Sequence, residues 1–278
     1  MHEKKICVIT GCNSGIGKNT AIELAKLGYE IIMLVRDSEK SRNAYEEIKK
    51  ESGSELLQLI YIDLASLESI KKSADELKKK ISKINVLINN AGIFKRKEAR
   101  SPEGFELTIA VNYLAPFYLT KLLLPLIENA ESSRIISLSS ELYKNGKVYL
   151  DSRFSNTKFD GTKAYADSKL LVIYFTKSLA KRLSTTSVTV NALHPGVIGT
   201  DVFREYPKWF SRLLSLFIST PEMGAQPSVY LATSAEVKGL TGKYFYKTKV
   251  KETDPVANDE ELADNIWEKT EELINSIT

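Results

Sequence analysis

The chain has 278 residues, 43% of them hydrophobic, which is enough for one large domain with a sizeable core. Its net charge is +4, and its lysines lie mostly in runs shared with glutamates, which indicates solvated helix faces and excludes a nucleic-acid-binding stripe. The two cysteines, Cys7 and Cys12, fit no disulfide framework and no zinc or redox spacing. Because the first residues lead directly into an apolar strand and no run of 18 apolar residues stands out, we expect a soluble cytoplasmic protein without a signal peptide, a transmembrane anchor or a bound metal.

Short apolar runs alternate with longer amphipathic stretches. The runs predict strands at residues 5–10, 30–35, 56–62, 84–90, 134–139 and 187–193. The stretches between them predict one helix that ends at residue 27 and further helices at residues 38–51, 66–80, 103–129 and 162–183. Continuously apolar strands are typical of a parallel sheet that is buried on both faces. With no linker or repeat, this alternation predicts one doubly wound α/β domain over residues 1–278, which binds ligands at the carboxyl ends of its strands.

A glycine-rich loop, TGCNSGIGKNTA, follows the first strand. Its glycines are Gly11, Gly15 and Gly17. The phosphate loop of kinases and ATPases needs glycine where Cys12 stands and serine or threonine where Asn19 stands, and the G-x-G-x-x-G spacing is also absent. The glycines still permit a tight turn and a close backbone approach, and the next helix directs free N–H groups at a pyrophosphate. The pattern therefore predicts a dinucleotide loop, with a purely structural turn as the alternative.

The end of the second strand bears on the choice of dinucleotide. In such folds an acidic residue here binds the ribose 2′-hydroxyl, whereas an arginine accommodates a 2′-phosphate. Val35 takes the acidic position and Arg36 follows it, which favours NADP(H) over NAD(H). Asp37 comes one position later, so a shift of one residue would favour NAD(H) instead.

The spacing Y-x-x-x-K is a candidate for acid–base chemistry. It occurs at residues 45–49, 143–147 and 165–169. The first pair lies on the helix after the second strand, away from the switch point, and the second is interrupted by an Asn-Gly turn. Tyr165 and Lys169 share one face of a long helix, where the ammonium should lower the pKa of the phenol so that it acts on a carbonyl or alcohol. The strand before this helix ends in Ser139 and Ser140, whose hydroxyls could hydrogen-bond the reacting oxygen.

The chain resembles the short-chain dehydrogenase/reductase family. The resemblance is carried, in the family's order, by TGCNSGIG at 10–17, DLAS at 63–66, NNAG at 89–92, VNYLAPF at 111–117, SLSS at 137–140, YADSK at 165–169 and HPGVIGT at 194–200. It implies a Rossmann-type fold with a parallel seven-stranded sheet flanked by helices. It also implies a catalytic tetrad of Asn112, Ser140, Tyr165 and Lys169, with Ser139 as the alternative serine.

The resemblance and the glycine loop together imply the cofactor contacts. Asp63 would contact the adenine, residues around Asn89 the ribose, and the segment from Pro195 the nicotinamide, while His194 would be a structural neighbour. The full set is Gly11, Asn13, Ser14, Gly15, Ile16, Gly17, Arg36, Asp63, Leu64, Asn89, Ala91, Gly92, Tyr165, Lys169, Pro195, Gly196, Val197 and Thr200.

A narrower resemblance is to the retinol dehydrogenase-like branch, which includes WW-domain oxidoreductases and protochlorophyllide reductases. It is carried by the segments LVRDSEK, YKNGKVYLDSRFSNTKFDG, STPEMGAQPSVYLATS and DEELADNIWEKTEELI. Animal retinol dehydrogenases commonly carry an N-terminal membrane anchor, which we do not expect here, so retinol itself is not assumed to be the substrate.

The implied reaction is hydride transfer between a nicotinamide and a carbonyl carbon. Tyr165 would donate the proton in reduction and remove it in oxidation. Lys169 would lower the pKa of Tyr165 and touch the nicotinamide ribose, Ser140 would hold the substrate oxygen, and Asn112 would bend its helix and support a water relay. A catalytically silent dinucleotide sensor is the alternative, although all four tetrad positions are filled. A monomer and a homodimer both stay open.

The segment at 201–220, DVFREYPKWFSRLLSLFIST, follows the last motif. At helical spacing it predicts an apolar stripe opposite Lys208 and Arg212, formed by Trp209, Leu213, Leu216 and Phe217. The stripe fits three interpretations: core packing, a lid over an apolar substrate, or a basic helix in peripheral contact with a membrane.

Overall fold

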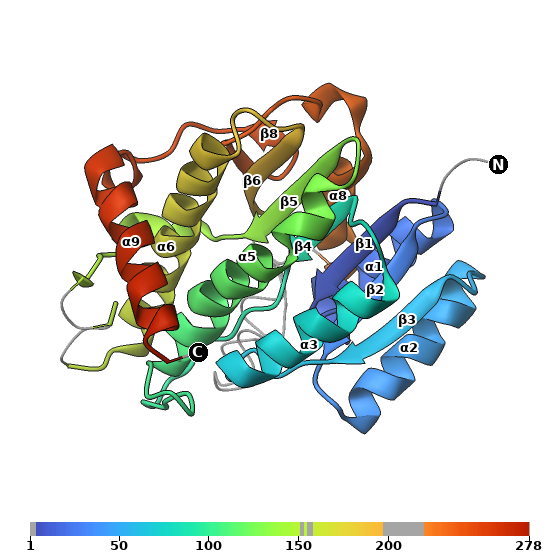
Figure 1. Cartoon of the computed structure of the whole chain (residues 1–278), viewed down its shortest axis with the longest axis horizontal. Helices are drawn as coiled ribbons and strands as arrows, with labels where there is room; N and C mark the ends of the chain where they lie inside the picture. Colours follow the sequence, from blue (N-terminus) through green and yellow to red (C-terminus); the bar gives the residue numbers. More distant parts are fainter. Residues whose placement is uncertain (1–3, 151–152, 155–157, 197–219, 278) are drawn as a thin grey trace.

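The computed structural model describes residues 4–150, 153–154, 158–196 and 220–277, and their main feature is one twisted sheet between two layers of helices (Figure 1). The strands are β1 Ile6–Thr10, β2 Glu30–Val35, β3 Leu57–Tyr61, β4 Val86–Asn89, β5 Ser133–Leu138, β6 Val188–His194, β7 Tyr244–Tyr246 and β8 Lys249–Val250. Their order in the sheet is β3-β2-β1-β4-β5-β6-β7-β8. The first seven are parallel, as predicted, and β8 adds a short antiparallel eighth strand.

The helices follow the predicted alternation. They are α1 Gly15–Lys26, α2 Glu39–Ser52, α3 Leu67–Lys80, α4 Leu107–Ile109, α5 Ala115–Glu128, α6 Gly161–Arg182, α8 Pro221–Thr233 and α9 Glu260–Asn275, with the π-helix η1 Ala110–Leu114 and the 3-10 helices η2 Glu141–Asn145, η5 Ala235–Val237 and η6 Pro255–Ala257. Caps fix several of their ends. For α2, the Ser38 side chain accepts a hydrogen bond from the Ser41 N–H, and Gly53 ends the helix in the left-handed region.

The central strands separate two hydrophobic clusters because successive side chains point to opposite faces. In β1, Ile6 and Val8 join the cluster beneath α3, α5, α6 and α9, while Cys7 and Ile9 join the cluster beneath α1, α2 and α8. Every residue of β1 and β4 is buried, as expected for a parallel sheet that is covered on both sides. The carboxyl ends of β1, β2, β4, β5 and β6 therefore meet at one edge of the sheet.

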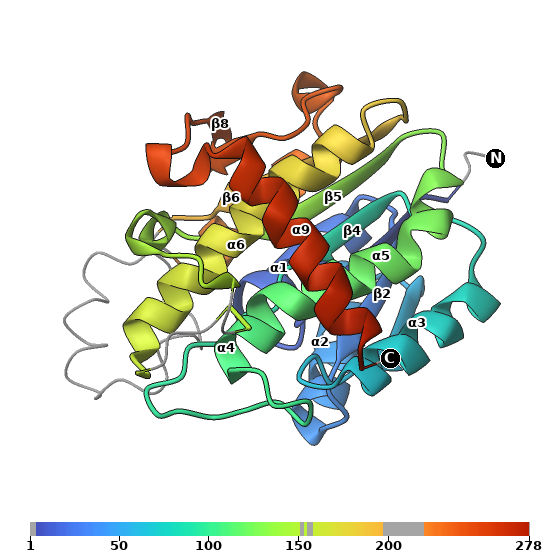
Figure 2. The ribbon, with the colours of Figure 1, turned by 60° about the vertical axis from the view of Figure 1, so that its left-hand side comes forward.

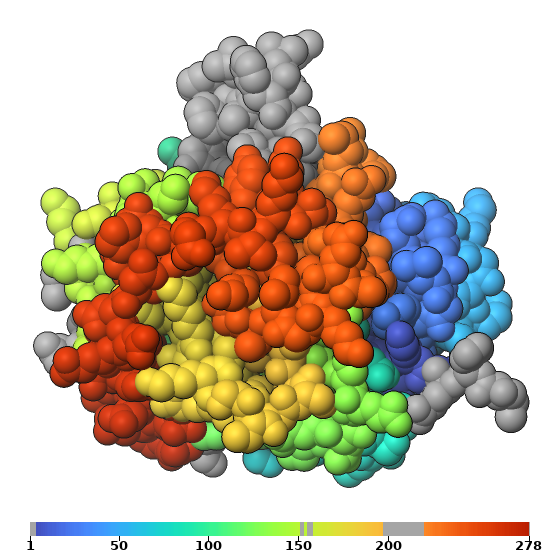
Figure 3. Space-filling model, turned by 90° about the horizontal axis from the view of Figure 1, so that it is seen from above, coloured from blue at the N-terminus to red at the C-terminus, as the bar shows by residue number. Residues whose placement is uncertain are grey.

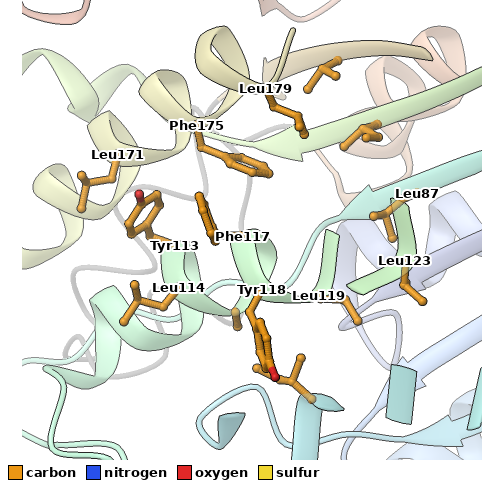
Figure 4. Packing of buried hydrophobic residues seen from close by; sticks show 14 of the residues in the cluster. Leu87, Tyr113, Leu114, Phe117, Tyr118, Leu119, Leu123, Leu171, Phe175 and Leu179 are labelled. Atoms are coloured by element: carbon orange, nitrogen blue, oxygen red, sulfur yellow. The ribbon is translucent and has the colours of Figure 1, made fainter. Parts of the chain in front are cut away.

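The predicted helix at 103–129 is instead a composite of α4, η1 and α5 that begins at Leu107. Glu106 caps its start by accepting a hydrogen bond from the Ile109 N–H. By length and composition, residues 107–128 could cross a membrane, with a mean hydropathy of 1.4, although we expected no such run. The protein buries 78% of that apolar stretch, so it serves as a core helix (Figure 4).

Helix α9 lies across α5 and α6 (Figure 2); α6 carries the candidate residues Tyr165 and Lys169, and α5 directly follows the π-helix that contains Asn112. The Trp267 ring stacks on Phe175 of α6 at 6.3 Å and packs on Phe117 of α5 at 4.7 Å. The guanidinium of Arg182 lies 4.3 Å from the centroid of the Trp267 ring. Figure 3 shows the described C-terminal residues, orange to red, spreading over one face of the molecule. The packing of α9 therefore holds α5 against α6 and supports the site residues on and next to these two helices.

Candidate functional site

The glycine loop turns sharply at the carboxyl end of β1. Gly11 and Gly15 have φ values of +65° and +55°, a region that favours glycine. A Cβ atom on Gly11 would lie 2.9 Å from the Ala91 Cα, and one on Gly17 would lie 2.4 Å from the Asn90 Nδ2. The loop therefore packs directly on the segment after β4, and side chains at Gly11 or Gly17 would force the two apart.

Two residues that the sequence analysis did not single out hold this loop. The Thr10 hydroxyl accepts hydrogen bonds from the N–H groups of Asn90 and Ala91, both at 3.0 Å. The Asn90 side-chain amide donates to the carbonyl oxygens of Thr10 at 2.8 Å and Gly11 at 3.2 Å. Both residues lie inside quoted motifs, but their role depends on a contact between segments about 80 residues apart.

The start of α1 presents backbone donors at the same edge. Its first closing hydrogen bond runs from the Lys18 N–H to the Ser14 carbonyl, so the N–H groups of Gly15, Ile16 and Gly17 precede the intrahelical ladder. The first turn contains no acidic residue. Donors and a positive dipole end thus face the place where a pyrophosphate would lie, and these residues fit a bound dinucleotide.

The structure places Arg36 directly after β2. Val35 is the last residue of the strand, pairs with Tyr61 and is 3% exposed, so the strand ends where the sequence predicted. Asp37, which could have favoured NAD(H), forms an ion pair with Arg42. Within the part of the chain that the structure describes, the exposed Arg36 guanidinium has no carboxylate partner.

Some of the residues predicted to contact the adenine and the ribose use their side chains for contacts within the protein. The Asp63 carboxylate accepts a hydrogen bond from the Ala65 N–H at 3.0 Å, and Leu64 packs against the core. The Asn89 amide, 3% exposed, donates to Thr120 at 3.2 Å and to Ser137 at 3.3 Å. The side chain of Asn89 therefore joins β4, β5 and α5.

The acid–base candidates meet between β5 and α6. The Ser140 side chain lies next to the Tyr165 hydroxyl, close enough to lower its pKa as a hydrogen-bonding neighbour, and the Lys169 Nζ lies 5.5 Å from the centroid of the Tyr165 ring. The Lys169 ammonium also donates to the Leu138 carbonyl at 2.8 Å. Ser139 instead donates to the Lys169 backbone carbonyl at 2.9 Å. The geometry thus separates the two serines: Ser140 faces the phenol, and Ser139 ties the strand to the helix.

Burial has the largest effect on the pKa values of Tyr165 and Lys169. It raises the pKa of Tyr165 to about 12, against a smaller lowering by the Ser140 hydrogen bond. Burial also lowers the pKa of Lys169 to about 8. Lys169 therefore does not give Tyr165 a net lowering of its pKa here, contrary to our expectation. At neutral pH the phenol is protonated and the amine is mostly charged, which suits proton donation to a carbonyl.

Asn112 lies at the centre of the π-helix η1, a local widening of the kind often found at functional sites. Its Oδ1 accepts from the Ile93 N–H at 2.8 Å, and its Nδ2 donates to the Ile93 carbonyl at 2.9 Å and to Ser168 at 3.0 Å. A Cβ atom on Gly92 would lie 3.6 Å from this Oδ1 and 3.5 Å from the Lys169 Nζ. Glycine at 92 therefore leaves open the space between Asn112 and Lys169.

The other two Y-x-x-x-K pairs serve the fold. Tyr45 on α2 donates to the Leu57 carbonyl at 3.3 Å, and Lys49 pairs with Glu55. Tyr143 is fully buried, and its hydroxyl accepts from the Asp254 N–H at 2.8 Å.

The carboxyl end of β6 completes the described part of the site. His194 is 8% exposed, and burial lowers its pKa to about 4, so it is neutral at pH 7. Pro195 follows the strand, and Gly196 has a φ of +98°. Val197, Thr200 and the segment 201–219 lie outside the described residues. Phe94, which the sequence analysis missed, packs edge-on against Tyr165 with ring centroids 5.9 Å apart.

Comparisons with known proteins identify the family of this chain. A family model described as short chain dehydrogenase matches residues 5–210. Human retinol dehydrogenase 14 is 40% identical, over 99% of this chain and 87% of its own, and human retinol dehydrogenase 13 is 39% identical, over 97% and 84%. A solved structure of an uncharacterized protein from Mycobacterium paratuberculosis aligns with a TM-score of 0.80 at 28% identity, covering 98% of this chain and 93% of that one. The chain belongs to the short-chain dehydrogenase family, in its retinol dehydrogenase-like branch, and is a dinucleotide-dependent oxidoreductase.

Proposed function

We propose that the protein is an NADP(H)-dependent oxidoreductase that interconverts carbonyl groups and alcohols on apolar substrates. The observation that carries the proposal is the buried Tyr165, whose hydroxyl lies next to Ser140 and whose ring centroid is 5.5 Å from the Lys169 ammonium. A bound nicotinamide would supply or accept the hydride.

Residues of the protein itself transfer the proton. Tyr165 donates it from the phenol oxygen to a carbonyl oxygen in reduction and takes it back in oxidation. Ser140 holds the substrate oxygen beside the phenol. As the phenol loses its proton, the Lys169 ammonium favours the phenolate that forms. Asn112 keeps one lone pair of Oδ1 for a water molecule, because both hydrogens of its Nδ2 and the other lone pair bind protein groups.

The preference for NADP(H) over NAD(H) rests on the loop after β2. A 2′-phosphate needs a cation, and the exposed Arg36 guanidinium is placed to provide one. A 2′-hydroxyl needs a free carboxylate, whereas Asp37 is paired with Arg42.

The apolar substrate class rests on the relatives and on the composition of residues 201–220. The two human relatives are named for retinol, a long apolar alcohol. The stripe in this segment lies outside the described residues, and a lid is the interpretation that links it to such substrates.

For straight-chain aldehydes, kcat/KM should rise about three- to fourfold per added methylene, because each buried CH₂ contributes about 0.8 kcal/mol. Steady-state rates over a homologous series measure this slope. Phe210→Ala or Phe217→Ala should flatten it while the protein stays folded. A flat profile in the unmutated protein would contradict an apolar pocket, and activity that requires lipid vesicles would support the membrane interpretation.

The function is tested by mixing purified protein with NADPH or NADH and a panel of aldehydes, ketones, quinones, retinal and steroid ketones. Absorbance of the reduced nicotinamide reports turnover. We expect turnover of apolar carbonyls, faster with NADPH. Binding of NADPH without turnover of any carbonyl would instead identify a dinucleotide sensor.

A further inference from the structure

Ser41 links the glycine loop to the loop that carries Arg36. It lies in the first turn of α2 and is fully buried. Its hydroxyl donates to the Arg36 carbonyl at 2.7 Å and accepts from the Asn13 side-chain amide at 2.9 Å. A third contact, at 2.9 Å, joins it to the Ser38 hydroxyl.

The hydrogen positions in this group follow from counting donors. Ser41 has one hydroxyl hydrogen, and the Arg36 carbonyl, which can only accept, takes it. The hydrogen between the two serines must then come from Ser38, which still accepts from the Ser41 N–H at 3.2 Å. The Ser41 oxygen thus donates once and accepts twice, so its capacity is used entirely within the protein.

The group connects two parts of the predicted cofactor site that are otherwise separate in sequence. Asn13 lies between Gly11 and Gly15, where the pyrophosphate would bind, and Arg36 lies where a 2′-phosphate would bind. Because one buried oxygen bonds both, a shift of the Arg36 backbone relative to the glycine loop breaks at least one hydrogen bond.

We propose that Ser41 is a positioning residue that sets the preference for a 2′-phosphorylated dinucleotide by fixing the Arg36 backbone relative to the glycine loop. The proposal rests on the proposed use of Arg36 for NADP(H). Because Ser41 is fully buried, it would act through Arg36 and not by direct contact with the cofactor. A second contact acts in the same direction: Arg42, on the same helix, forms an ion pair with Asp37 and so occupies the carboxylate that would otherwise compete for a ribose 2′-hydroxyl.

Isothermal titration of NADPH and NADH into the full chain tests this. Ser41→Ala should raise the Kd for NADPH about three- to tenfold, the range expected for a lost hydrogen bond that orients a charged group, and leave the Kd for NADH within about twofold. Ser52→Ala is the matched control, because Ser52 lies on the same helix and donates to the Ile48 carbonyl at 2.6 Å. The control should leave the ratio of the two Kd values unchanged.

A double variant shows whether Ser41 acts through Arg36. In an Arg36→Ala background, Ser41→Ala should no longer change the ratio of the two Kd values. If Arg36→Ala lowers the preference for NADPH but Ser41→Ala does not, the inference about Ser41 is wrong and the cofactor proposal stands. If Arg36→Ala leaves the preference unchanged, the cofactor proposal itself fails.

A purely structural role has a different signature. Equal weakening of both cofactors by Ser41→Ala, together with a lower Tm, would overturn the proposal. Should Ser41→Ala not fold, Ser41→Cys keeps nearly the same volume with a weaker donor, and a selective loss of NADPH affinity in that variant would support it.

Discussion

Tyr165→Phe should lower kcat for carbonyl reduction by about 10²–10⁴-fold and leave the affinity for NADPH nearly unchanged, because it removes only the acid–base oxygen. The phenol is 9% exposed, and its ring packs against Phe94, a contact that phenylalanine keeps. The fold should therefore survive the substitution, and the loss should be confined to the chemical step. Steady-state kinetics beside a titration of NADPH separate the two effects.

Tyr45→Phe is the control for this substitution. Tyr45 is also followed by lysine four positions later, but it lies on α2 and its hydroxyl bonds a strand carbonyl. It should change kcat by less than about twofold, since it removes one hydrogen bond far from the site. Retention of most activity in Tyr165→Phe would remove Tyr165 from the mechanism, whatever the control shows.

Reduction and oxidation need different protonation states of the same phenol. With a pKa of about 12, Tyr165 holds its proton over the whole physiological range and is ready to donate. Oxidation needs the phenolate, so it depends more strongly on the Lys169 ammonium, whose own pKa is about 8. At neutral pH the protein is therefore in the protonation state from which reduction starts, whereas the net direction follows from the concentrations of the substrates and the cofactor forms.

Local pattern was enough to predict β1 to β6, whereas a seventh strand was expected only from the family resemblance. Apart from Thr10 at the end of β1, the buried positions of β1 and β2 are all apolar, which is typical of a parallel strand covered on both faces. The end of the apolar run in β2 predicted that Val35 is the last residue of the strand and that Arg36 follows it. β8 could not be found in this way. Its two residues, Lys249 and Val250, are both exposed, and two residues are too few to show a hydrophobic pattern.

Features that depend on contacts between distant segments were not predictable. The π-helix around Asn112 accompanies hydrogen bonds to Ile93 and Ser168, neither of which is near it in sequence. The resemblance indicated Ser140, but the separate role of Ser139, which donates to the Lys169 carbonyl, depends on the position of α6. Asn90 looked like the neighbour of a contact residue, although its amide holds the glycine loop in place.

Arg36→Ala should weaken NADPH binding about 10- to 100-fold and leave NADH nearly unchanged. A charge-assisted contact with a phosphate contributes about 1.5–3 kcal/mol, and each 1.4 kcal/mol is about tenfold in Kd. The Arg36 guanidinium is exposed and has no carboxylate partner in the described part of the chain, so its removal leaves no buried charge behind. The whole effect should therefore appear in the affinity for the phosphorylated cofactor.

The dependence on ionic strength and a control substitution at Arg182 test whether the effect of Arg36→Ala is specific to the 2′-phosphate. Because the contact is between exposed charges, the advantage of NADPH over NADH should shrink as ionic strength rises in the unmutated protein and be insensitive to salt in Arg36→Ala. Arg182→Ala, at the far end of α6 from Tyr165, removes an equal charge that packs on Trp267 and should leave the ratio of the two Kd values unchanged. Equal weakening of NADPH and NADH by Arg36→Ala would mean that Arg36 supports the adenosine site in general and does not recognise a 2′-phosphate.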